Sequence, residues 1–232
     1  MAGFQMESKP FWKFRDICLV IVIIIGASIL LMPLLNIIFR NERVVKYLFL
    51  FFSATITLLT PVLWIKKYYN LGKEALGIRK GRWRLRFTVL TGVGAALIFF
   101  LAESIVIGHK LDISLYFHNF SKILWFTLSL DGFITHLYGP ISEEVFFRGF
   151  LFGYAERRLG LIPGLLLQAV IFGFLHFAIS PARAVSILFH GSLIGLSCGI
   201  LYKISDSLYP AIIFHCTLNL FLTIAKISQL TS

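Results

Sequence analysis

Charge is what this sequence most lacks. Only 14% of its 232 residues are charged, against about 25% in an ordinary soluble domain, while 58% are hydrophobic and 24 are Phe. A soluble domain of this length still exposes much of its surface, so one core could not hide so much apolar material. Cysteine is scarce too: three Cys cannot all pair within the chain, which excludes a secreted disulfide scaffold. The composition indicates an integral membrane protein.

The hydrophobic residues fall into seven long runs that are almost free of charge. A membrane-spanning helix needs about 20 apolar residues, and lipid requires its backbone to satisfy its own hydrogen bonds. The runs cover residues 17–39, 44–65, 87–107, 123–140, 161–179, 184–202 and 210–225. Another helix is expected to begin near Ile141, after a break at Gly139-Pro140. The sequence therefore predicts an all-α fold, a polytopic transmembrane bundle of about seven or eight helices.

Positive charge is concentrated in one segment, residues 66–86. Its eight basic residues, against the single acid Glu74, are Lys66, Lys67, Lys73, Arg79, Lys80, Arg82, Arg84 and Arg86. Short Lys/Arg-rich loops between membrane helices face the cytoplasm and meet anionic lipid headgroups. We therefore expect a multi-pass protein of a bacterial or archaeal cell membrane, with the N-terminus and loop 66–86 cytoplasmic. Membrane lipids are the expected partners of this loop, and nucleic acid is not.

Ionisable groups inside apolar helices are costly and indicate function. The densest such site is Glu143-Glu144, followed by Arg148. On a helix Glu144 and Arg148 stand at i and i+4, in the favourable order of acid before base, so Arg148 can neutralise Glu144. Glu143 points about 100° away around the helix axis. It is left without that partner and free to titrate, which a purely structural salt bridge would not explain.

Two further polar sites lie in later apolar runs. His176 follows Phe172 by one helical turn, and His215 and Asn219 share one face of the last helix. Each site alone is compatible with a packing contact, because Asn and His hydrogen-bond across membrane bundles. Their occurrence together with the paired glutamates favours chemistry.

The three sites resemble the motifs of a known family, the CPBP intramembrane proteases. That family includes the type II CAAX prenyl endopeptidases and bacteriocin-processing or abortive-infection proteins. The motifs that carry the resemblance are Glu143-Glu144-x-x-x-Arg148, Phe172-x-x-x-His176 and His215-x-x-x-Asn219. On this basis residues 1–122 are expected to form variable N-terminal membrane helices, and residues 123–232 a CPBP-like catalytic helix bundle.

The resemblance implies an intramembrane endopeptidase whose substrate is a membrane-associated peptide or protein. The roles that it implies are a water-activating base for Glu143, a water-orienting group for His176, oxyanion donors for His215 and Asn219, and a supporting ion pair for Glu144 with Arg148. Donors fixed in a low-dielectric site are worth more than in water, and losing one costs about 10²–10³ in rate.

Metal dependence is a separate question. Glu143, His176 and His215 could hold zinc with one position open for water. However, the H-E-x-x-H signature of zinc proteases is absent, and Asn219 is a poor zinc ligand but a good oxyanion donor. We favour catalysis without an obligatory metal or other cofactor, and keep zinc as the alternative.

Two other classes of protein fit parts of the pattern. An ion-coupled transporter also buries Glu, His and Asn near mid-membrane, but it would show repeat symmetry, which is not found here. A non-catalytic bacteriocin-immunity protein would keep the bundle without the complete motif set. The intramembrane residues Glu103, Asp131 and His190 receive no role.

Depth within the membrane gives a less consistent picture. If helices alternate from a cytoplasmic N-terminus and a new crossing begins at Ile141, Glu143 and His176 fall near the cytoplasmic side. His215 then falls on the other side. Either one short segment does not cross fully, or the site lies deep in the bundle beside a water-filled cavity.

Overall fold

The computed structural model describes residues 11–107, 120–179 and 184–229, and every regular element within them is a helix. The elements are α1 (Phe14–Ile38), α2 (Glu42–Tyr69), the 3-10 turn η1 (Lys73–Leu76), α3 (Leu85–Ile107), α5 (Phe120–Leu128), α6 (Leu130–Phe133), η2 (Ile134–Tyr138), α7 (Gly139–Glu144), η3 (Val145–Phe152), α8 (Gly153–Leu159), α9 (Leu161–Ile179), α10 (Ala184–Ser205) and α11 (Tyr209–Gln229). The predicted all-α bundle is confirmed.

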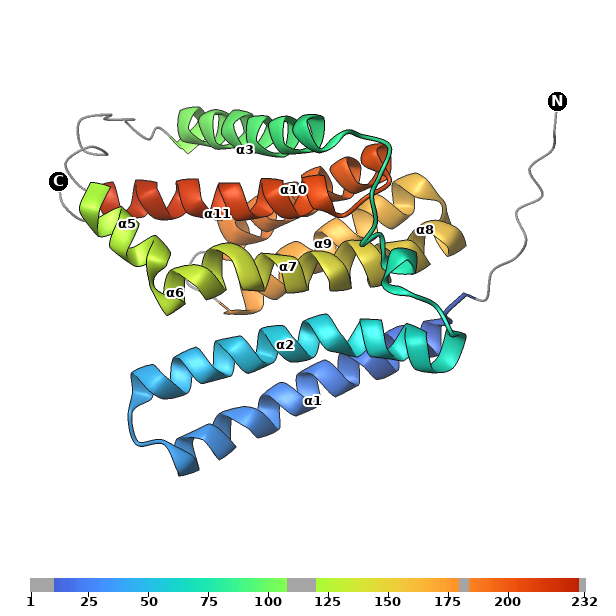
Figure 1. Cartoon of the computed structure of the whole chain (residues 1–232), viewed down its shortest axis with the longest axis horizontal. Coiled ribbons are helices and arrows are strands. Elements are labelled where there is room, and N and C mark those ends of the chain that lie inside the picture. Colours follow the sequence, from blue (N-terminus) through green and yellow to red (C-terminus); the bar gives the residue numbers. More distant parts are fainter. Residues whose placement is uncertain (1–10, 108–119, 180–183, 230–232) are drawn as a thin grey trace.

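The helices lie roughly along one direction, with α7 and its continuations in the middle of the molecule (Figure 1). The α1–α2 hairpin covers one side of this central segment, and α3 packs on α11 at the opposite side. Among the described elements, α9 and α10 pack against each other most extensively. Among the described residues, five helices are long and apolar enough to cross a membrane: Phe14–Ile38, Glu42–Tyr69, Leu85–Ile105, Leu188–Ser205 and Tyr209–Lys226.

The central segment does not break at Gly139-Pro140, so that expectation is wrong. Helix α6, the π-helix η2, α7, the π-helix η3 and α8 follow one another directly from residue 130 to 159, with right-handed helical backbone at each junction. A proline is tolerated near the start of α7 because the preceding turn is π-helical. The Gly139 N–H bonds the Ile134 carbonyl five residues back. In that register the missing Pro140 N–H would have bonded Thr135.

This continuity also corrects the expected depths. No new crossing begins at Ile141; the segment from α5 to α8 passes along the bundle once (Figure 1). Glu143 therefore lies midway along a pass rather than near its beginning. His176 on α9 and His215 on α11 lie on helices that both run antiparallel to this segment (Figure 1). Their side chains come within 4.0 and 3.8 Å of Glu143, so the expected separation in depth between His215 and the other two residues is wrong. The site lies within the bundle.

The basic loop docks across one end of the bundle. The Leu208 N–H donates to the Gly77 carbonyl at 2.9 Å, and Leu76 is completely buried. A Cβ added at Gly149 in η3 would lie 2.6 Å from the Leu76 carbonyl oxygen, so only glycine admits this approach. Arg79 is paired with Asp206 at the α10–α11 turn, whereas most of the other loop cations are exposed.

Candidate active site

The predicted ion pair between Glu144 and Arg148 is present at the junction of α7 and η3. Arg148 Nη1 donates to Glu144 Oε1 at 2.9 Å, and both side chains are fully buried. Arg148 Nη2 donates to the Gly195 carbonyl of α10 at 3.1 Å. Its guanidinium also lies over the Phe172 ring, 4.5 Å from the centroid, a cation–π contact that is strongest where water is excluded. The charge of Arg148 is thus neutralised without solvent.

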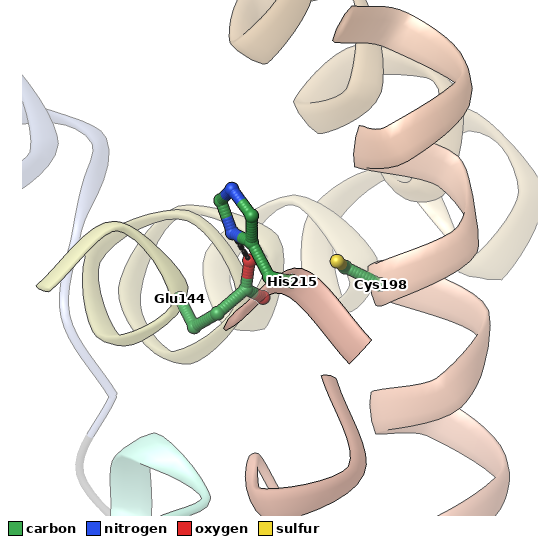
Figure 2. Close-up of side chains that lie close together, drawn as sticks. All are labelled: Glu144, Cys198 and His215. Atoms are coloured by element: carbon green, nitrogen blue, oxygen red, sulfur yellow. Dashed lines mark hydrogen bonds and ion pairs between the residues drawn. The ribbon is translucent and has the colours of Figure 1, made fainter. Parts of the chain in front are cut away.

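Glu144 has a second partner that the sequence did not predict. Its Oε1 lies 2.9 Å from His215 Nδ1, and Figure 2 shows the imidazole standing on this carboxylate. Since a carboxylate only accepts hydrogen bonds, Nδ1 carries the proton. The other ring nitrogen, Nε2, is directed towards Glu143. Glu144 therefore fixes both the orientation and the tautomer of His215.

His176 is held in a similar way, but by backbone. Its Nδ1 lies 2.9 Å from the Phe172 carbonyl, one turn earlier on α9. A carbonyl oxygen can only accept, so Nδ1 is again the donor and Nε2 is left for other partners. The Phe172 ring contacts both histidines, with its centroid 4.4 Å from that of His176 and 5.7 Å from that of His215. Phe172 is itself fully buried, so both imidazoles pack against a ring that is held in the core.

The three remaining atoms converge. Glu143 Oε2 lies 3.8 Å from His215 Nε2 and 4.0 Å from His176 Nε2. Both separations exceed a hydrogen bond, and Glu143 Oε2, although buried, makes none within the described part of the chain. The side chains of Glu143 and His176 are 32% and 39% exposed, whereas that of His215 is 4% exposed. The cluster is therefore open on the Glu143–His176 side and closed behind His215.

Asn219 lies one turn beyond His215 on α11, as predicted, but its recorded partner is outside this cluster. Its Nδ2 donates to the Thr135 carbonyl of η2 at 3.1 Å. The structure thus brings Glu143, His176 and His215 together through their side chains. It holds Asn219 beside them through the π-helical turn.

Sequence reasoning missed the support behind the ion pair. Gln168 is fully buried on α9, and its Nε2 donates at 2.9 Å to the same Gly195 carbonyl that Arg148 uses. A Cβ at Gly195 would lie 2.8 Å from the Cα of Ala169, so the glycine lets α9 and α10 approach closely. The signal was available: Gly191, Gly195 and Gly199 repeat every four residues, a spacing typical of close helix packing in membranes.

The converging residues also offer the ligand types of a catalytic zinc site. Two neutral imidazoles with free Nε2 atoms and one carboxylate match such a site, and the bonds at the far ring nitrogens match the outer-shell contacts of metal-binding histidines. Glu143, His176 and His215 would be the ligands. A tetrahedral zinc with ordinary bond lengths would place its ligand atoms about 3.4 Å apart. The observed separations from Glu143 Oε2, 3.8 and 4.0 Å, are wider.

A second group of possible ligands consists of the buried residues Glu144, Cys198 and His215 (Figure 2). One candidate ligand atom from each residue lies within 4.8 Å of the other two. The group does not fit a metal. His215 Nδ1 donates its proton to Glu144 Oε1, and that proton occupies the lone pair that a metal would need. Within this group Glu144 and His215 bond each other, and the Cys198 thiol donates to the Ala211 carbonyl at 3.9 Å.

A separate carboxylate–histidine pair joins α3 to α10. His190 Nδ1 lies 2.8 Å from Glu103 Oε1, and the His190 ring packs edge-on against Phe99. Two of the residues that the sequence left without a role are thus partners of each other. They do not contribute an atom to the converging cluster around Glu143.

Residues 124–221 match the family described as Rce1-like, type II CAAX prenyl endopeptidase Rce1-like. No curated protein and no solved structure matches the chain. The matched segment contains all seven residues of the three motifs, from Glu143 to Asn219, together with Gln168 and Gly195. Over these residues the chain resembles the type II CAAX prenyl endopeptidases of the Rce1-like family.

Proposed function

We propose that this chain is an intramembrane endopeptidase that hydrolyses a peptide bond of a membrane-associated substrate with water activated by Glu143. The observation that carries the proposal is the convergence of Glu143 Oε2 with the Nε2 atoms of His176 and His215 at 4.0 and 3.8 Å. The family match supports the reaction class. The 4.0 Å between Glu143 Oε2 and His176 Nε2 suits a water that donates to both atoms at ordinary hydrogen-bond distance.

In the proposed reaction His176 Nε2 accepts one hydrogen bond from the water, while Glu143 takes the other proton. The water oxygen forms a bond to the peptide carbonyl carbon, and the carbonyl oxygen becomes an oxyanion. Glu143, now a carboxylic acid, gives its proton to the amide nitrogen as the C–N bond breaks. Protons balance, since the carboxylate is regenerated and the products are a carboxylic acid and an amine.

Stabilisation of the oxyanion would come from His215 and Asn219. Donation from His215 Nε2 requires a second ring proton, because Nδ1 is already protonated towards Glu144. The Glu144 carboxylate is the group that would stabilise the resulting imidazolium, as the buried acid does in serine protease triads. Asn219 Nδ2 has two N–H bonds, and only one is used by Thr135.

Zinc is the alternative activator. Held by Glu143, His176 and His215, it would supply Lewis-acid polarisation and a more acidic water. The wide separations around Glu143 Oε2 and the absence of the H-E-x-x-H signature support the metal-free reaction.

The test is cleavage by the purified full chain in detergent. The probes are an internally quenched farnesylated CAAX peptide and the same peptide without the lipid. We expect cleavage of at least one probe, and we expect it to survive strong zinc chelation. Loss on chelation with recovery on stoichiometric zinc would favour the metal mechanism. Cleavage of neither probe, or proton-coupled solute uptake into vesicles, would favour the non-catalytic or transporter alternative.

Orientation is a second part of the proposal. The N-terminal end of α1, the basic loop and the α10–α11 turn lie at one end of the bundle (Figure 1), and the positive charge of the loop favours the cytoplasm for that end. In a Cys18→Ser background, which removes the exposed native thiol, Lys80→Cys should be protected from an impermeant thiol reagent in intact cells. Ready labelling from outside would reverse the assignment.

A further inference from the structure

The carbonyl that holds Asn219 is free because of a proline. In η2 the hydrogen bonds follow the π-helical register, with the Gly139 N–H bonded to the Ile134 carbonyl. The next bond in that register would run from residue 140 to the Thr135 carbonyl, but residue 140 is proline and has no N–H. A carbonyl without an intrahelical partner accepts from elsewhere, and here it accepts from Asn219 Nδ2 at 3.1 Å.

The same turn is fastened to α11 by a second contact, one turn further along. His136 is buried, and its Nε2 lies 2.9 Å from Thr223 Oγ1. Thr223 stands four residues beyond Asn219, so both face η2. On its other side η2 is tied to α2, where Tyr138 Oη and Thr55 Oγ1 are 2.8 Å apart. The position of the Thr135 carbonyl is therefore fixed from two sides.

We propose that η2 is a positioning device for Asn219: Pro140 leaves the Thr135 carbonyl free to orient the Asn219 amide, and His136 with Thr223 holds that carbonyl in place. This inference rests on the proposed function for its catalytic consequence. With one N–H bonded to Thr135, the rotation of the Asn219 amide is fixed and its second N–H keeps one direction. An oxyanion donor acts through such preorganisation.

The sharpest test is Pro140→Ala. Alanine restores an N–H that competes with Asn219 for the Thr135 carbonyl, and it removes a poor helix former. We expect the melting temperature to stay or rise. We expect kcat to fall at least several-fold, and by no more than the 10²–10³-fold cost of losing an oxyanion donor altogether, with KM little changed. Pro33→Ala, at an exposed position inside α1, is the matched control and should leave kcat unchanged. Unchanged kcat in a folded Pro140→Ala chain would overturn the proposal.

The second test is a double-mutant cycle with Thr223→Val, which removes only the hydroxyl. Thr223→Val should lower kcat in the wild-type chain but have no further effect in Asn219→Ala, because the group that it positions is already gone. Thr217→Val, on the opposite face of α11 from His215, is the control. Equal losses in both backgrounds would show that Thr223 acts independently of Asn219 and would contradict the inference.

A readout without catalysis separates this inference from the proposed function. The side-chain amide of Asn219 can be observed by NMR in the chain labelled with ¹⁵N-Asn and assigned with Asn219→Ala. Its resonance should shift, and its hydrogen exchange should accelerate, in both Pro140→Ala and Thr223→Val but not in Thr217→Val. If the peptides are not cleaved while these shifts occur, the proposed function fails and the positioning stands. If the amide is unaffected, the positioning fails.

Discussion

Two regions of this bundle place a carboxylate near histidine inside apolar helices. They differ in whether the carboxylate and the histidine bond each other directly. Between α3 and α10, Glu103 and His190 meet directly at 2.8 Å. Around α7, α9 and α11, Glu143 faces two histidines at 3.8 and 4.0 Å and bonds neither. The histidines are instead held from behind, by Glu144 and by the Phe172 carbonyl.

The difference shows what a buried polar group needs for chemistry. A direct pair uses its own donor and acceptor and mainly joins two helices. A carboxylate that faces fixed nitrogens without bonding them retains the capacity to bind water or substrate between them. Ionisable residues in a membrane are functional candidates, but the geometry of the unused atoms separates the candidates.

The largest expected effect is on the reaction. Glu143→Gln removes the proposed base but keeps the size and hydrogen-bonding capacity of the side chain, so we expect cleavage to fall by about 10²–10⁴-fold. The melting temperature should change little, because Glu143 is partly exposed and makes no recorded hydrogen bond through Oε2. Glu103→Gln, the same substitution in the other region, is the control and should cleave normally. Normal cleavage by Glu143→Gln would remove the distinction between the regions.

The next effect is on stability. Glu144→Gln leaves the fully buried charge of Arg148 uncompensated, which costs about 3–5 kcal/mol in the free energy of unfolding. Arg148→Gln should cost a similar amount, and the double variant should recover part of it, because the two charges leave together. Thermal melting in detergent measures all three. If Glu144→Gln melts like Glu143→Gln, the two adjacent glutamates do not divide their roles as proposed.

The smallest effect concerns the direct pair. Glu103→Leu leaves the partly buried His190 without its partner, and a stranded polar group of this kind costs about 1–3 kcal/mol. Because Glu103 contributes nothing to the cluster around Glu143, kcat and KM should stay near the wild-type values once the chain is folded. A loss of kcat comparable to that of Glu143→Gln would place Glu103 in the reaction and erase the contrast.

Much of the fold could be read from the sequence because it depends on local composition. Long charge-poor runs predict membrane helices whatever their neighbours are, and these runs are helical in the structure. The break at Gly139-Pro140 was predicted wrongly, since a proline normally ends a helical hydrogen-bond pattern. The π-helical turn before it and the side chain of Asn219 accommodate the missing donor, and neither can be read from residues 139 and 140.

The site divides in the same way. The sequence by itself determined the Glu144–Arg148 pair, because two residues four apart on one helix meet through helical periodicity alone. It also determined which polar residues the apolar helices carry. Only the tertiary structure decided that Glu144 orients His215, 71 residues away, that Glu143 faces two histidines, and that Arg79 pairs with Asp206. Such contacts depend on how helices that are distant in the sequence pack together. Packing is fixed by the fit of whole helix surfaces, such as the close approach of α9 and α10 at Gly195, and not by the spacing of residues along one helix.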